Sequence, residues 1–241
     1  MSILINKILS IRYISMMEIF SQKGKIYTFL NPVSYLTALK NKQIFCHFDG
    51  IFSDGLILVK AIKLLYGKTV KRKSFDMTSI APELFSFAEK NQKAVYIVAS
   101  TQEQIEKSIT ILQAHYPLLK IVGYRNGYFD SEEEQDTEAK HICQINPHFL
   151  IVGMGTPLQE KFLIKVKEKG FQGIGFTCGG FIHQTSQNKI NYYPKWVDKA
   201  NLRFIYRIWK EPHTRRRYLT ASFLFPIQFL IERISDTNKE S

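Results

Sequence analysis

Short apolar segments alternate with longer amphipathic segments along most of the chain. The short apolar runs predict strands at residues 25–30, 43–48, 94–98, 120–122, 149–152 and 173–176. Between them, apolar positions recur every three or four residues, which predicts helices at 33–40, 56–65, 80–90, 102–115, 131–144 and 159–169. This alternation favours an α/β fold with a Rossmann-like, mostly parallel sheet that carries helices on both faces.

Both ends of the chain are apolar, but neither predicts a membrane-spanning segment. Residues 1–20 are interrupted by Lys7, Arg12 and Glu18, and no small-residue cleavage site follows. We therefore expect a strand and a helix of the fold there, not a signal peptide. Residues 219–231 are apolar but contain Pro226, and they are too few to cross a bilayer, which takes about twenty helical residues.

Positive charge is concentrated near the carboxyl end. The 241 residues carry a formal charge of +12, and residues 199–218 contain seven Lys or Arg and a single Glu. Such a segment suits phosphate from a nucleotide, a nucleic acid or an anionic membrane. We expect an α/β core at residues 1–194 and a basic, partly apolar helical appendage at 195–241.

The three cysteines lie far apart, without metal-ligand spacing, which indicates a reducing, cytoplasmic setting.

Residues 149–160 read Phe-Leu-Ile-Val-Gly-Met-Gly-Thr-Pro-Leu-Gln-Glu and are the most informative part of the chain. A buried strand is followed by two glycines that permit a sharp turn, and Pro157 suits the first turn of a helix. Ligands of open α/β sheets bind at such junctions, where free N–H groups and the helix dipole favour phosphate. Gly153-x-Gly155 alone is a weak signal because the third glycine of a dinucleotide fingerprint is missing.

The whole string Gly-x-Gly-x-Pro-x-Gln-Glu resembles the signature of the WecG/TagA/CpsF glycosyltransferases. These bacterial enzymes move an N-acetylmannosamine-type sugar from UDP onto a lipid-linked acceptor. Matching elements follow in order over about residues 25–218, although Ile182 replaces an acidic residue that the family often has. The resemblance implies Asp54 as catalytic base and these substrate-binding residues: Thr28, Asn31, Arg72, Asp76, Gly153, Gly155, Gln159, Glu160, Gly180, Arg207 and Arg215.

Several of these residues also have an ordinary structural interpretation. Asp54 precedes Gly55, so it is either a turn residue that caps the following helix or a carboxylate placed to take a proton from a sugar hydroxyl. Asp76 is either a sugar ligand or a helix N-cap. Gln159 suits a uracil edge or a sugar amide, or it only caps its own helix. The family's early Thr-x-Asn element ends at Asn31, and either Thr28 or Phe29 stands near its threonine.

The sequence contains no Asp-x-Asp pair that would hold Mg²⁺ on a diphosphate. We therefore expect a metal-independent, inverting transferase without a cofactor, in which Arg207 and the cluster at Arg215 neutralise the leaving UDP. The resemblance implies a UDP-sugar donor, a polyprenyl-diphosphate-linked acceptor, an anionic membrane surface and no nucleic acid as partners, and it leaves a homo-oligomer open. It predicts a peripheral protein on the cytoplasmic face of the cell membrane.

Two other functions explain the sequence less completely than a glycosyltransferase does. A Rossmann-type oxidoreductase is weakened by the missing third glycine and by the lack of a ribose-binding acid about twenty residues further on. A basic module that binds membranes or nucleic acid accounts for the charged tail but leaves Gly-x-Gly-x-Pro-x-Gln-Glu unexplained.

Overall fold

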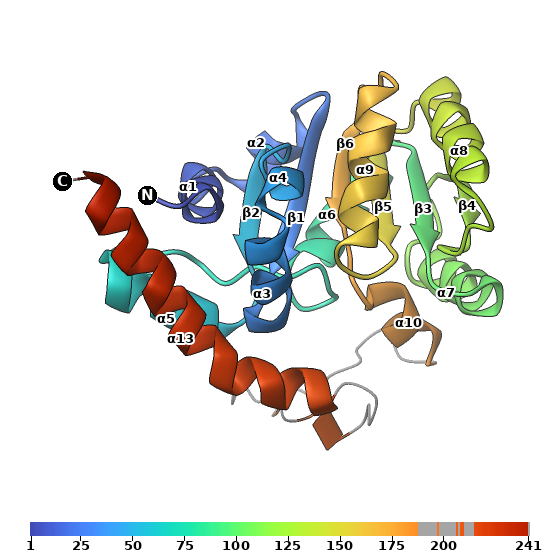
Figure 1. The fold of residues 1–241 in the computed structure, drawn as a ribbon. Coiled ribbons are helices and arrows are strands. Elements are labelled where there is room, and N and C mark those ends of the chain that lie inside the picture. The colour runs from blue at the N-terminus through green and yellow to red at the C-terminus, as the bar shows by residue number, and fades with distance from the viewer. Residues whose placement is uncertain (188–196, 198–205, 207, 210–214, 241) are drawn as a thin grey trace.

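The computed structural model describes residues 1–187, 197, 206, 208–209 and 215–240. Within them, a six-stranded sheet has the order β2-β1-β6-β5-β3-β4, and every neighbouring pair is parallel. Figure 1 shows the strands side by side, with their carboxyl ends at one edge of the sheet. The strands are β1 (Lys25–Leu30), β2 (Gly50–Ser53), β3 (Val95–Ala99), β4 (Ile121–Arg125), β5 (Phe149–Gly153) and β6 (Ile174–Thr177).

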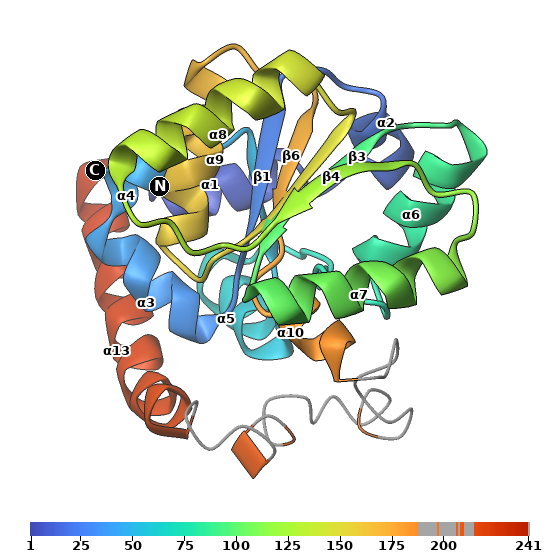
Figure 2. The ribbon, with the colours of Figure 1, turned by 90° about the vertical axis from the view of Figure 1, so that its right-hand side faces the viewer.

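Helices cover both faces of this sheet, as the pattern of apolar positions predicts (Figure 2). One face packs against α2, α6 and α7, the other against α8 and α9, and α1, α3, α5 and α13 form a third cluster beside β1 and β2. The helices are α1 (Ile3–Ser10), α2 (Met16–Phe20), α3 (Pro32–Lys40), α4 (Lys42–Phe45), α5 (Leu56–Tyr66), α6 (Ile80–Lys90), α7 (Gln102–His115), α8 (Glu132–Ile145), α9 (Leu158–Glu168), α10 (Phe181–Ser186) and α13 (Arg215–Glu240).

The α/β class and the parallel sheet are confirmed, but two predicted elements are wrong. Residues 43–48 are not a strand: α4 covers their first part, and the strand β2 follows at Gly50–Ser53. Phe45 and Phe48 are both buried at helical spacing, and a short apolar run does not distinguish the two structures. Residues 1–20 form two helices and no strand, because Ser15 and Glu18 make a capping box that starts α2.

The described end of the appendage is one 26-residue helix, α13, which includes Pro226. Its inner face buries Ala221, Phe225 and Phe229, and the helix runs across α3 and α5 (Figure 1). Within the described residues, no helix is long and apolar enough to cross a membrane. The division at residue 194 stays a prediction, while α13 shares a core cluster with the rest of the chain.

The strand order creates a crevice at the carboxyl edge of the sheet. The chain leaves β3 toward β4 at one side and leaves β5 toward β6 at the other, although β3 and β5 are neighbours. Loops that depart in opposite directions leave space between them, and open α/β sheets bind ligands at such points. The fold therefore places the turn after β5 beside a natural binding crevice.

Candidate active site

A cavity of about 750 Å³ opens at the carboxyl edge of the sheet. Its walls come from the loops that follow all six strands, from the segment between α5 and α6, and from the first half of α13. The fold thus brings together segments from nearly the whole chain. The predicted site residues that line this cavity are Asn31, Asp54, Arg72, Asp76, Gly153, Gly155, Gln159 and Gly180.

Asp54 comes directly after β2 and lines the cavity. Its backbone N–H donates to the Leu30 carbonyl at 2.8 Å, which holds the end of β2 against β1. Gly55 has a φ of +103° and is the N-cap of α5, a helix that no side chain caps. The interpretation of Asp54 as the N-cap of this helix is therefore wrong, and its role as the base stays a prediction.

Asn31 stands at the corresponding place after β1. Its side-chain oxygen accepts from the N–H groups of Val33 and Ser34, so Asn31 caps α3 while it also lines the cavity. The structure also separates the two candidates before it. Phe29 lines the cavity, whereas Thr28 is fully buried beneath it.

Arg72 and Asp76 approach from the segment between α5 and α6. Arg72 forms an isolated parallel bridge with Ser53, so it lies beside the end of β2 and close to Asp54 in the cavity wall. Asp76 accepts hydrogen bonds from both the N–H and the hydroxyl of Thr78, at 2.8 and 2.6 Å. The N-cap of α6 is Ser79, so Asp76 shapes the turn before the helix without being its N-cap.

The turn after β5 depends on its two glycines. A Cβ on Gly153 would lie 2.6 Å from the Cys178 sulfur, so only glycine permits this approach of β5 and β6. Gly155 has a φ of +76°, which side-chain-bearing residues rarely adopt. Pro157 follows a cis peptide bond and is the N-cap of α9, so it precedes the first turn of this helix, whereas the sequence predicts it within that turn.

Beneath this turn, Glu160 accepts three hydrogen bonds through one oxygen. Its Oε1 lies 2.9 Å from Thr28 Oγ1, 2.9 Å from Gln159 Nε2 and 3.3 Å from Thr156 Oγ1. Thr28 Oγ1 also lies 2.8 Å from Thr177 Oγ1. Because the single proton of Thr28 goes to Glu160, Thr177 is the donor in that second bond. The cluster joins β1, β6 and the start of α9 below the cavity.

Two opposing effects act on the pKa of the Glu160 carboxyl. Burial raises the pKa of this carboxyl, against the hydrogen bonds from Gln159 and Thr28 that lower it. The side chain is fully buried, and its Oε2 has no hydrogen-bond partner within the part of the chain that the structure describes.

Gln159 lies between this cluster and the cavity. Its amide NH₂ donates to Glu160 and Thr156, and its oxygen accepts from the Gly179 N–H at 3.1 Å. The amide therefore fixes the turn after β6 to the start of α9. Its role toward a uracil or a sugar stays a prediction.

The loop after β6 completes this side of the cavity. Gly180 is the N-cap of α10, and His183 and Gln184 on that helix also line the cavity. Ile182, which lies between Gly180 and His183, is fully buried and does not line the cavity.

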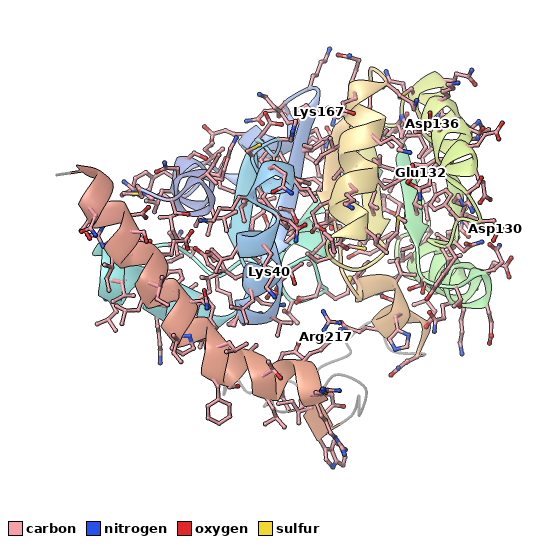
Figure 3. All side chains as sticks on the ribbon, viewed as in Figure 1. Lys40, Asp130, Glu132, Asp136, Lys167 and Arg217 are labelled. Atoms are coloured by element: carbon pink, nitrogen blue, oxygen red, sulfur yellow. The ribbon has the colours of Figure 1, made fainter. Side chains whose placement is uncertain are left out.

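Within the predicted cluster at Arg215, the arginine that lines the cavity is Arg217 and not Arg215. Arg215 donates to the main-chain carbonyls of Ile208 and Trp209, at 2.9 and 3.4 Å, and it does not line the cavity. Arg217 does line it, and Figure 3 shows this side chain on the side of α13 that faces α10. Arg207 lies outside the described residues.

Sequence reasoning missed a group of residues at the far side of the cavity, namely Ser100, Thr101, Gln104 and Tyr128. Two of them follow β3, which is a neighbour of β5. A usable signal was present, because Ser100 and Thr101 follow the strand predicted at residues 94–98, much as Asn31 follows the strand predicted at 25–30.

No three His, Cys, Asp or Glu side chains gather in a group that could hold a metal ion, as far as the described residues extend. The charged side chains that line the cavity from these residues are Asp54, Asp76, Arg72 and Arg217.

Comparison with known proteins gives a consistent group of relatives. The chain is 32% identical over 209 residues to the UDP-Gal:alpha-D-GlcNAc-diphosphoundecaprenol beta-1,4-galactosyltransferase of Shigella boydii, with 87% of each chain covered. It is 26% identical over 214 residues to the N-acetylglucosaminyldiphosphoundecaprenol N-acetyl-beta-D-mannosaminyltransferase of Bacillus subtilis, with 87% of this chain and 81% of the relative covered. A Staphylococcus aureus enzyme of the same name is 28% identical over 157 residues, which are 65% of this chain and 59% of the relative.

The sequence profile of the Glycosyl transferase WecG/TagA/CpsF family matches residues 8–239, which is almost the entire chain. This match includes both the strands that form the cavity and the helix α13 that closes one side of it. The chain is therefore a glycosyltransferase that belongs to the WecG/TagA/CpsF family.

Proposed function

We propose that this enzyme transfers a hexose from UDP to a lipid-diphosphate-linked N-acetylglucosamine, with inversion at the anomeric carbon. Asp54 takes the proton from the acceptor hydroxyl as that oxygen bonds to the anomeric carbon, and the bond from this carbon to the UDP oxygen breaks on the opposite side. The observation that carries the proposal is the presence of Asp54, Arg72 and Arg217 in one cavity.

The leaving diphosphate requires positive charge, and two arginines line this cavity. Arg72 comes from the segment beside β2, and Arg217 comes from α13, so they reach the cavity from different parts of the fold. Guanidinium groups bind phosphate oxygens in pairs, and the N–H groups at the start of α9 add a helix dipole. These groups take the place of a divalent cation in the proposal.

Two donor sugars are consistent with the relatives. The resemblance of the motifs predicts N-acetylmannosamine, which the Bacillus subtilis enzyme transfers according to its name. The greater identity to the Shigella boydii enzyme, which is named for UDP-galactose, favours galactose. Both relatives are named for an acceptor in which N-acetylglucosamine is linked to diphosphoundecaprenol, and we propose the same acceptor here.

We further propose that α13 rests on the anionic cytoplasmic surface of the membrane. Its outer face exposes a stripe of apolar side chains at helical spacing, opposite the inner face that packs on α3 and α5. Arg215 and Arg216 are exposed at the start of the same helix, where they would meet anionic lipid headgroups. The exposed apolar side chains are Leu219, Phe223, Leu224, Ile227, Leu230, Ile231 and Ile234.

The proposed reaction is tested with purified enzyme, a short-chain lipid diphosphate carrying N-acetylglucosamine, and a panel of UDP-sugars. We expect a disaccharide product with either UDP-galactose or UDP-N-acetylmannosamine, and the preferred donor decides between the two. The configuration of the product's new glycosidic bond, measured by NMR, should be inverted relative to the donor. The absence of a product with every donor would contradict the proposal.

A further inference from the structure

A buried carboxylate holds the second half of α13 against the domain. Glu232 is 6% exposed and accepts a hydrogen bond from the Tyr35 hydroxyl on α3 at 2.6 Å. Lys42 pairs with the same carboxylate at 2.9 Å, and the Ser2 hydroxyl donates to it. Burial of a charged group is costly unless it is paired and hydrogen-bonded, and this carboxylate has both kinds of partner.

A second buried carboxylate lies one turn later on the same face. Asp236 is 7% exposed and accepts from the Ser2 N–H at 2.6 Å and from the Tyr66 hydroxyl at 3.1 Å. Arg233, between the two acids, donates to the Leu65 carbonyl at 2.9 Å. We call Glu232 and Asp236 the α13 anchor.

The α13 anchor bonds to α3 and α5, two of the helices that begin at the cavity. Tyr35 is in the first turn of α3, the helix that the cavity residue Asn31 caps. Tyr66 is the last residue of α5, the helix that begins just after Asp54. The anchor therefore connects α13 to both of the elements that present polar side chains to the cavity from β1 and β2.

Apart from the hydrogen bond of Arg233 to Leu65, apolar side chains make the contact of α13 beside the anchor. Phe225 and Phe229 pack against Tyr35 with ring centroids 5.6 and 5.2 Å away. Apolar contact is non-directional, whereas hydrogen bonds have narrow distance and angle ranges. Arg217 lies about 22 Å along the helix from Glu232. If α13 rotated about its own axis by the angle between successive residues, about 100°, Arg217 would turn away from the cavity.

We propose that Glu232 and Asp236 are positioning residues that fix the rotation of α13, so that Arg217 faces the cavity together with Asn31 and Asp54. This inference rests on the proposed function of the cavity, because it assigns the positioned arginine to the leaving diphosphate. The acids themselves do not line the cavity, so they act on transfer through the helix.

The test combines the anchor variant Glu232→Ala/Asp236→Ala with Arg217→Ala in a double-mutant cycle, with kcat and KM measured well below each protein's Tm. In the intact enzyme, we expect Arg217→Ala to lower kcat/KM by about tenfold or more. In the anchor variant, transfer is already low, and the same substitution should cost less than about threefold. Glu232→Gln/Asp236→Asn keeps acceptor oxygens for both tyrosines and should restore most of the activity.

Hydrogen–deuterium exchange supplies a readout that does not depend on activity. We expect residues 215–226 to exchange faster in the anchor variant than in the wild type, while α8 exchanges equally in both. Tyr35→Phe/Tyr66→Phe keeps the rings and removes only the hydroxyl donors, so it gives the same test with a smaller effect if the alanine variant does not fold. Glu133→Gln, at an exposed position on α8, is the matched control and should change neither readout.

The inference is overturned if Arg217→Ala has the same cost in both backgrounds, or if exchange at residues 215–226 is unchanged. An enzyme that transfers no sugar from any donor would instead contradict the proposed function, and the exchange experiment would still test the anchor by itself.

Discussion

Thr28 on β1 donates a hydrogen bond to Glu160 on α9, with 2.9 Å between Oγ1 and Oε1. Both side chains are fully buried, although the sequence motifs suggest that they bind substrate. Through Thr156, Gln159 and Gly179, this pair connects to the turns that form the cavity floor. We therefore interpret Thr28 and Glu160 as supports of these turns.

The first prediction concerns the protonation of Glu160. Burial raises the pKa of this carboxyl above its ordinary value of 4.5. Between pH 4.5 and the higher pKa of the folded state, the unfolded chain has released a proton that the folded protein still holds. The free energy of unfolding of the wild type therefore decreases as the pH rises through this interval. Glu160→Gln has no titrating group at this position. The difference in free energy of unfolding, variant minus wild type, should therefore increase with pH.

Denaturant unfolding of both proteins between about pH 4 and about pH 8 measures this difference. It should be smallest at the acidic end, and the exposed substitution Glu133→Gln should show no such trend. A difference that is the same at every pH would mean that folding does not raise the pKa of Glu160.

The second prediction compares two arginines that are two residues apart. Arg217→Ala should lower kcat/KM by about tenfold or more, because it removes a guanidinium from the cavity. Arg215→Ala should have a much smaller effect, because Arg215 bonds to main-chain carbonyls outside the cavity. Steady-state kinetics on both variants measure kcat/KM. An equal decrease in kcat/KM for both variants would show that the tail acts only through its total charge.

The third prediction concerns divalent cations. Since Arg72 and Arg217 are assigned to the leaving diphosphate, transfer in excess EDTA should equal transfer with added Mg²⁺. Initial rates under the two conditions provide the measurement. A loss of activity in EDTA that returns with added metal would assign the neutralising role to a cation.

The fourth prediction tests α13 as a membrane contact. Phe223 is 75% exposed on the outer face of this helix, and Phe223→Asp places a charge where lipid is expected. Sedimentation with anionic vesicles should fall strongly, whereas activity on a water-soluble acceptor should change little. Leu118→Asp, at a position that is 79% exposed and outside α13, is the control. If both variants bound the vesicles equally well, α13 would not be the element that contacts the membrane.

Much of the fold was predictable because parallel strands and their helices have different apolar periods. The strands at residues 25–30 and 149–152 were predicted within one residue of β1 and β5. The edge strand β2 was missed because Gly50–Ser53 is only four residues long and follows an apolar helix that also resembles a strand. Length and local pattern could not separate these two neighbours.

The candidate site was less predictable than the fold, since motifs give order along the chain but not burial. The motifs identified Asn31, Asp54 and Gly155, which line the cavity, but they did not place Thr28 beneath it or Arg215 outside it. The two faces of α13 were also hidden, because residues 219–231 read as one apolar run. Only the helix geometry shows that Phe225 faces the domain while Phe223 faces outward.

We propose Asp54 as the base of this sugar-transfer site. Asp54→Asn keeps the size of the side chain and removes its basicity, so turnover should fall by roughly 10² to 10⁴. UDP binding should change little, because the diphosphate is assigned to the arginines. Single-turnover transfer from the preferred UDP-sugar, measured beside a UDP titration of the same variant, is the direct test. We expect intact UDP binding with lost transfer, and a variant that transfers sugar at the wild-type rate would show that Asp54 is not the base.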